Sequence, residues 1–81
     1  MTSPEKYKRY TWWQDADSDR TFLLVGIDYL EEKENHFADL WEVGMTKSKY
    51  VAFHVFDDLV QSRKLIHIHK EQPYKSYLHG V

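Results

Sequence analysis

Two histidines, His67 and His69, lie at alternate positions near the end of the chain. Alternate side chains on a β-strand share a face, which is the spacing of many zinc and copper ligand pairs. Further candidate ligands are His36, His54 and His79. A metal site needs several more ligands in fixed geometry, whereas simple alternation, with Ile66 and Ile68 facing the core, already explains the pair. We therefore expect no metal ion and no other cofactor.

The segment from Asp15 to Asp19 carries carboxylates at alternate positions, as the first half of an EF-hand calcium loop does. The second half of the calcium-loop pattern does not occur in this sequence. Arg20 stands where the loop needs a glycine for its sharp turn, and Gly26 stands where a bidentate glutamate would close the site. Aspartate and serine also bond to nearby backbone groups and favour turns. The sequence therefore predicts a solvated acidic turn.

Basic and aromatic residues are interleaved from Lys6 to Trp13. Aromatic rings that stack on bases, together with cations that neutralise phosphates, are the usual means of holding single-stranded nucleic acid. The net charge of −2 opposes this interpretation, because nucleic-acid-binding domains are usually basic. The alternative is an edge strand whose positive charges discourage pairing with other chains.

The paired tryptophans, Trp12 and Trp13, must point to opposite faces if they lie on a strand. Tyr10 would share the face of Trp12, which makes that face the more apolar. We therefore predict that Trp12 is buried and that Trp13 is exposed, with Arg9 beside it as a polar rim. The predicted binding residues are Tyr7, Arg9 and Trp13.

Charge is distributed unevenly along the 81 residues. Residues 1–13 carry three bases and one acid, residues 14–42 carry two bases and nine acids, and residues 43–81 carry six bases and three acids. Opposite charges can complement one another within the fold, or they can steer partners to different sides of the surface. A small core without cysteine also gains from self-association, so a homo-oligomer is a further expectation.

The chain has the length of one domain. We expect a flexible N-terminus over residues 1–6, a single β-rich domain over residues 7–69 and a C-terminal tail over residues 70–81. The first residues lack the apolar run of a signal peptide, and no stretch is long and apolar enough to span a bilayer. Together with the absence of cysteine, these features predict that the protein is cytoplasmic and does not associate with a membrane.

Apolar and polar residues alternate with a period of two through most of the chain, which predicts β-strands. The predicted strands are Tyr7–Trp13, Thr21–Leu30, Phe37–Met45, Tyr50–Val55 and Leu65–His69. Gly26 marks the place where the long second strand would bulge or bend. One or two helical turns should begin at the candidate N-cap Asp57 and continue through Arg63.

This succession of elements over residues 7–69 resembles an SH3-like barrel, which has a short helical turn before its fifth strand. No Ala-Leu-Tyr-Asp-Tyr-type strand precedes the acidic turn, so the resemblance implies no SH3 ligand site. The alternative is an open antiparallel sheet with the helix packed on one face. In either case the middle three strands should form a meander. The residues expected to be most buried there are Leu23, Val25, Ile27, Trp41, Val43, Val51, Phe53 and Val55.

Catalytic motifs do not occur in the sequence: there is no cysteine nucleophile, no glycine-rich phosphate loop and no Gly-x-Ser-x-Gly turn. We therefore expect a non-enzymatic protein-binding module, such as an adaptor or an inhibitor of the kind that mobile elements carry, acting through exposed aromatic residues. The alternative is a nucleic-acid-binding small barrel that uses the basic and aromatic N-terminal strand.

Overall fold

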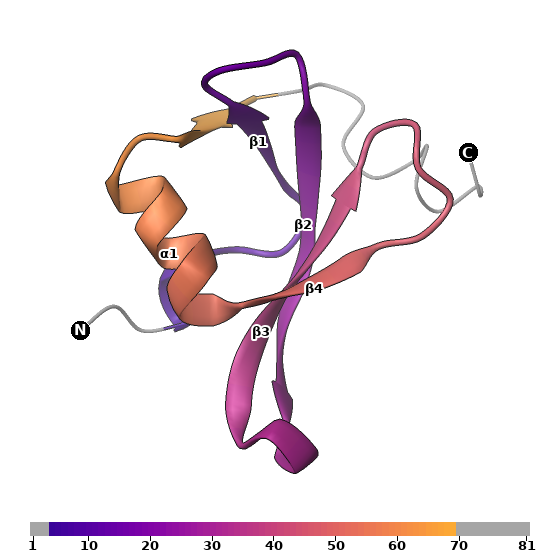
Figure 1. Ribbon diagram of the computed structural model, residues 1–81, viewed down its shortest axis with the longest axis vertical. Coiled ribbons are helices and arrows are strands. Elements are labelled where there is room, and N and C mark those ends of the chain that lie inside the picture. The colour runs from indigo at the N-terminus through magenta and orange to yellow at the C-terminus, as the bar shows by residue number, and fades with distance from the viewer. Residues whose placement is uncertain (1–3, 70–81) are drawn as a thin grey trace.

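The computed structural model describes residues 4–69, which form five strands and one α-helix (Figure 1). The elements are β1 Thr11–Asp15, β2 Thr21–Leu30, β3 Asn35–Glu42, β4 Lys49–Ala52, α1 Phe53–Gln61 and β5 Leu65–Ile68, with short 3-10 helices at Pro4–Lys6 and Glu31–Lys33. Predictions for residues 1–3 and for the tail over residues 70–81 lie outside the described residues. No helix among residues 4–69 is long and apolar enough to cross a membrane.

The five strands form one antiparallel sheet in the order β4-β3-β2-β1-β5. The predicted mostly-β fold and the meander of β2, β3 and β4 are confirmed. The open sheet, rather than the closed SH3-like barrel, is the alternative that forms. Within the described residues β4 and β5 remain the two edges of the sheet, and α1 runs from one edge to the other across a single face (Figure 1).

The long strand β2 is interrupted by the bulge that Gly26 predicted. Leu24 pairs with Leu40, and Gly26 pairs with the preceding residue Asp39, so Val25 has no opposite partner in β3. A bulge shifts the alternation of side chains by one position. Ile27 therefore packs on the same face as Leu24, although strict alternation from Leu24 would place it on the other face.

Apolar clusters lie on both faces of the sheet. The helix-side cluster consists of Tyr7, Trp13, Leu24, Ala38, Leu40, Phe56 and Leu65, and the far-side cluster consists of Trp12, Leu23 and Trp41. Alternation does send the paired tryptophans to opposite faces, as expected. However, the exposed fractions of Trp12 and Trp13 are only 5% and 6%. The prediction that Trp13 is exposed is wrong, because the face opposite Trp12 is also a packed face.

The helix begins at Phe53 with Ala52 as its N-cap, five residues before the predicted N-cap Asp57, and β4 ends at Ala52. Phe53, Phe56 and Val60 recur at the helical spacing and pack toward the helix-side cluster. Asp57 is therefore an interior helical residue and not an N-cap. Val55 points away from the sheet and is 41% exposed.

The predicted core is only partly correct. Leu23 and Trp41 are buried as expected, whereas Val43 and Val55 are 48% and 41% exposed. Val43 is exposed because β3 ends at Glu42 and the chain turns there, before the predicted end of the strand. The other four predicted core residues, which are Val25, Ile27, Val51 and Phe53, are half-buried at the margins of the two clusters.

Removing either paired indole should destabilise the fold. We expect Trp12→Ala and Trp13→Ala each to lower the free energy of unfolding by about 3–5 kcal/mol, the cost of truncating a large aromatic residue in a core. The aromatic control is Tyr29→Ala, because Tyr29 is 52% exposed and the loss of its ring should cost less than about 1 kcal/mol. Urea denaturation measures all three. A Trp13→Ala variant with wild-type stability would restore the exposed-anchor interpretation.

Candidate binding sites

Trp13, the predicted exposed anchor, is held in the helix-side cluster. Its ring lies 5.4 Å from the ring of Phe56 and 5.9 Å from that of Tyr7, in edge-to-face geometry. Its Nε1–H donates a hydrogen bond of 2.9 Å to Thr11 Oγ1. A ring with both its apolar body and its polar atom satisfied in this way stabilises the fold, and its faces are not available for a partner.

Tyr7 lies before β1 rather than within it, because the strand begins at Thr11 and Tyr10 takes a left-handed conformation with φ of 62°. The Tyr7 hydroxyl donates a 2.5 Å hydrogen bond to Asp57 Oδ1 on α1. Burial, as the larger cause, and the neighbouring Asp57 carboxylate together raise the pKa of Tyr7 to about 12. Tyr7 thus ties the N-terminal segment to the helix.

Arg9, the third predicted binding residue, is exposed but does not lie beside Trp13. Its Nε–H donates to the Val25 carbonyl at 3.1 Å, and its guanidinium lies over the Tyr10 ring with 5.1 Å between Cζ and the ring centroid. A Cβ placed on Gly26 would lie 3.4 Å from Arg9 Nε. Tyr7 lines one hollow with Trp13 and another with Arg9, but Arg9 and Trp13 share neither hollow. The three predicted residues therefore do not form one contact surface.

The histidine pair lies on β5, where His67 is opposite Trp13 of β1. The His67 ring is 4.9 Å from the Trp13 ring and 5.0 Å from the ring of His69. Among residues 4–69 no three His, Cys, Asp or Glu side chains are grouped so that they could hold a metal ion, and His79 lies outside those residues. The expectation that Ile66 faces the core is wrong, because it is Leu65 that packs in the helix-side cluster.

The acidic segment forms the β1–β2 turn. Asp15 Oδ1 accepts the backbone N–H of Asp17 at 3.0 Å, and Asp15 Oδ2 accepts the Ser18 hydroxyl at 2.9 Å. These hydrogen bonds lower the pKa of Asp15, with the backbone bond the larger cause. The first carboxylate of the segment is therefore occupied in shaping the turn, as the turn interpretation expects.

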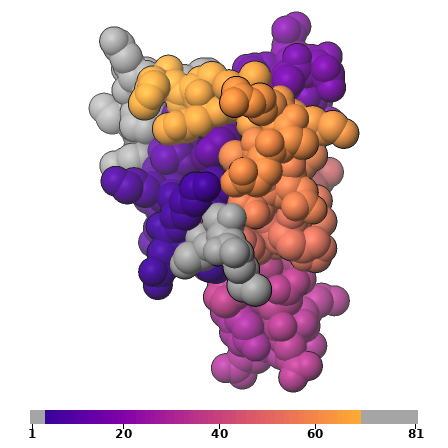
Figure 2. Space-filling view, turned by 90° about the vertical axis from the view of Figure 1, so that its left-hand side faces the viewer, coloured from indigo at the N-terminus to yellow at the C-terminus, as the bar shows by residue number. Residues whose placement is uncertain are grey.

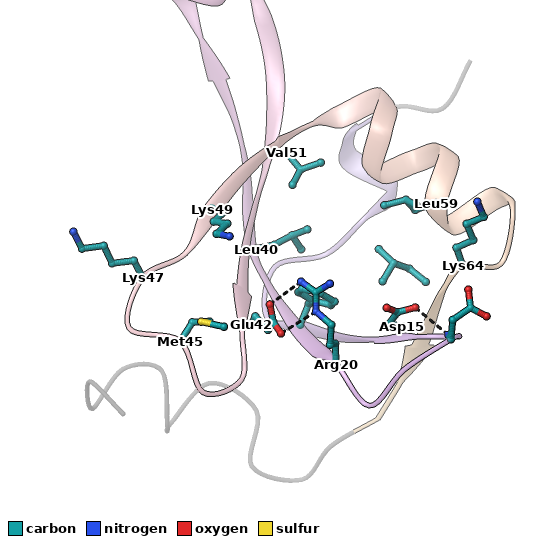
Figure 3. A pocket seen from close by; sticks show the side chains of 13 residues that line it. Asp15, Arg20, Leu40, Glu42, Met45, Lys47, Lys49, Val51, Leu59 and Lys64 are labelled. Atoms are coloured by element: carbon teal, nitrogen blue, oxygen red, sulfur yellow. Dashed lines mark hydrogen bonds and ion pairs between the residues drawn. The ribbon is translucent and has the colours of Figure 1, made fainter.

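A pocket of about 410 Å³ opens at one end of the space between α1 and the sheet (Figure 3). We call it the end pocket. It lies between the β1–β2 turn, the β3–β4 loop and the C-terminal part of α1. Its floor is apolar and consists of Phe22, Leu40, Val51, Leu59 and Leu65. Both edge strands contribute to this floor, which shows that the sheet curls around the helix without closing.

Charged side chains of both signs surround the end pocket. The Arg20 guanidinium donates two hydrogen bonds of 2.9 Å to the Glu42 carboxylate, one to each oxygen, and lies 5.2 Å above the Phe22 ring. This contact lowers the pKa of Glu42. Lys47 and Lys64 stand at opposite sides of the opening (Figure 3) and belong to no ion pair within residues 4–69.

A second hollow, of about 690 Å³, lies on the other side of the helix. Figure 2 views the molecule from the side on which this hollow lies, where residues 4–10, the helix and β5 meet. Lys6 and Lys8 stand on one wall, Arg63 on the opposite wall, and His67 at the β5 end. We call it the basic groove. Lys6 and Lys8 belong to the interleaved basic and aromatic segment from Lys6 to Trp13, but no local pattern pointed to Arg63.

No protein-family model, curated protein or solved structure matches the chain at a significant level.

The buried phenol of Tyr7 predicts a loss of stability in alkali. An unfolded tyrosine loses its proton near pH 10.0, whereas folded Tyr7 keeps its proton to about pH 12. Between these values the folded state binds more protons, so the free energy of unfolding falls as the pH rises. Urea titrations across this range should show that fall, and Tyr7→Phe should remove the part due to Tyr7.

Asp57→Asn is the matched variant. It should lower the pKa of Tyr7 toward its ordinary value without reaching it, because burial, the larger cause, remains. Absorbance at alkaline pH follows the ionisation directly. If Tyr7→Phe and the wild type lose stability equally across this range, the buried phenol does not govern the alkaline limit.

Proposed function

We propose that the protein is a non-enzymatic protein-binding module, an adaptor or inhibitor that works inside the cell, and that the end pocket receives an apolar side chain of its partner. The observation that carries the proposal is an apolar floor inside a ring of charges of both signs. The volume of about 410 Å³ falls within the range of pockets that bind ligands.

The floor supplies the affinity in this proposal. Interfaces draw most of their binding free energy from a few residues that fill dry, well-packed pockets. Leu40 and Leu65 are buried at the base, and Val51 and Leu59 are half-buried at the sides, so an inserted side chain would displace water from apolar surface on all sides. Met45, 47% exposed on the β3–β4 loop, extends this apolar surface outward.

The rim supplies the specificity. Arg20 and Glu42 neutralise each other at one side of the opening. Lys47 and Lys64 remain available to a partner, because within the described residues they form no ion pair. With Lys49, the lysines of the lining outnumber its remaining carboxylates, Asp15 and Asp17. Charge complementarity then favours a partner segment in which the apolar residue has acidic neighbours.

This proposal keeps the protein-binding function predicted from the sequence but moves the site. Because Trp13 is buried, the proposal places the contact at the end pocket instead. Nucleic-acid binding, the alternative, would use the basic groove on the other side of α1.

Selection from a library of displayed random peptides tests the proposal without knowledge of the partner. Peptides that bind the wild-type protein should share one large apolar residue with acidic residues next to it. Filling the pocket by Val51→Trp should weaken their binding by about 30-fold or more, the scale of losing an interface hot spot.

Two further variants separate loss of binding from loss of the fold. Val55→Trp adds the same ring at an exposed helical position outside the pocket and should leave peptide binding unchanged. Replacing both Lys47 and Lys64 by Glu changes only exposed residues and should shift the selected peptides from acidic to basic neighbours. Selected peptides that bind the wild type and Val51→Trp equally would contradict a role for the end pocket.

A further inference from the structure

The basic groove differs from the end pocket in the sign of its charge. Lys6 and Lys8 contribute two positive charges from the segment before β1, and Arg63 contributes a third from the end of α1. No carboxylate is among the described residues that line the groove. None of the three cations forms an ion pair within residues 4–69. The fold has therefore placed cations from distant parts of the chain on facing walls.

We propose that the basic groove binds a phosphate-bearing chain, a single-stranded nucleic acid, through its phosphates. A strand lying between the two walls would place phosphates within reach of lysines on one side and of a guanidinium on the other. The arginine fork can bond two phosphate oxygens at once, and each neutralised phosphate releases counterions.

The basic groove offers a ligand positive charge rather than apolar surface. Its two large rings, Tyr7 and Trp13, are buried in the helix-side cluster, so they cannot anchor a partner protein or stack on several bases. The ring that remains exposed in the groove is His67, which already lies against Trp13. A groove of this kind suits a ligand recognised by regularly spaced anionic groups, and it offers one ring on which a base could stack.

The backbone conformation of Arg63 is a second, independent observation in favour of this site. It follows the helix in a left-handed conformation with φ of 63°. The N–H of Arg63 bonds to the Val60 carbonyl at 3.1 Å, and that of Lys64 bonds to the Leu59 carbonyl at 2.8 Å. These two bonds form the Schellman motif, in which glycine is the favoured residue at this position. An arginine here costs backbone strain, and strain of this kind is often retained where a side chain is used.

The acidic part of the chain does not cover the groove. Glu31, Glu32 and Glu34 lie at the tip of the β2–β3 hairpin, which projects from the opposite end of the molecule in Figure 1 and lies below the groove in Figure 2. The net charge of −2 therefore does not describe the lining of the groove, where the nearest carboxylate established by hydrogen bonds is Asp57, behind Tyr7 and Gln61.

Fluorescence anisotropy with a labelled oligothymidylate of about 10 nucleotides, a length typical of small single-strand-binding folds, tests this inference. With three phosphates neutralised, affinity should fall about 20-fold between about 50 and about 200 mM salt. Replacing Lys6, Lys8 and Arg63 together by Gln should abolish binding. The exposed Lys33 on the β2–β3 hairpin provides the control, and Lys33→Gln should bind as the wild type does.

Arg63→Gly separates binding from folding, because its two effects have opposite signs. Glycine relieves the left-handed strain, so the melting temperature should rise by a few degrees. The loss of one phosphate contact should at the same time weaken oligothymidylate binding and reduce the slope of its salt dependence by about 0.7. A more stable variant that binds more weakly cannot be explained by unfolding.

Three outcomes would overturn the inference. One is no binding of oligothymidylate at the lower salt concentration. Another is an equal loss of binding in Lys33→Gln and the triple variant. The third is polyglutamate binding as tightly as oligothymidylate, which would make an acidic protein the ligand. The pocket-filling variant Val51→Trp should leave oligothymidylate binding intact, so this inference and the proposed function can fail separately.

Discussion

Aromatic rings join α1 to the curled sheet and to the segment before β1. Phe56 has no exposed surface, and its ring meets Tyr7 at 5.0 Å and Trp13 at 5.4 Å, edge to face in both cases. These rings hold the helix across the face of a sheet whose edges do not pair with each other. The end pocket and the basic groove lie on either side of this contact, so each has the same helix as one wall. A shift of Phe56 would alter both hollows together.

The strands could be predicted from alternation, and the bulge could be predicted from Gly26 in a strand that is apolar on both faces. The start of the helix could not. Val51, Phe53 and Val55 fit the period of two of a strand. Phe53, Phe56 and Val60 fit the period of a helix equally well, and a short apolar run does not decide between the two. The prediction that Trp13 is exposed was wrong for a related reason. Alternation tells which residues lie on opposite faces, but it does not tell whether both faces are covered.

The sites were less predictable than the fold, because their residues converge from segments that are distant in sequence. The end pocket combines the β1–β2 turn, the β3–β4 loop and the helix, and its Arg20–Glu42 pair spans 22 residues. Composition revealed only that the middle of the chain is acidic. Two of the three cations of the basic groove, Lys6 and Lys8, lie close together in the sequence. Arg63 reaches the groove only because α1 ends opposite them. Both candidate sites therefore depend on contacts that no local motif records.

The hydrogen bond from Tyr7 to Asp57 joins residues 50 positions apart, which has a consequence for the order of folding. The β2–β3–β4 meander needs only near neighbours and can form early. Closing so long a loop is slow, and on the ribosome the N-terminal segment must wait for the helix to emerge. A chain stalled before that closure would expose the apolar underside of the meander. Delayed synthesis of the last third of the chain would thus prolong the state most open to aggregation.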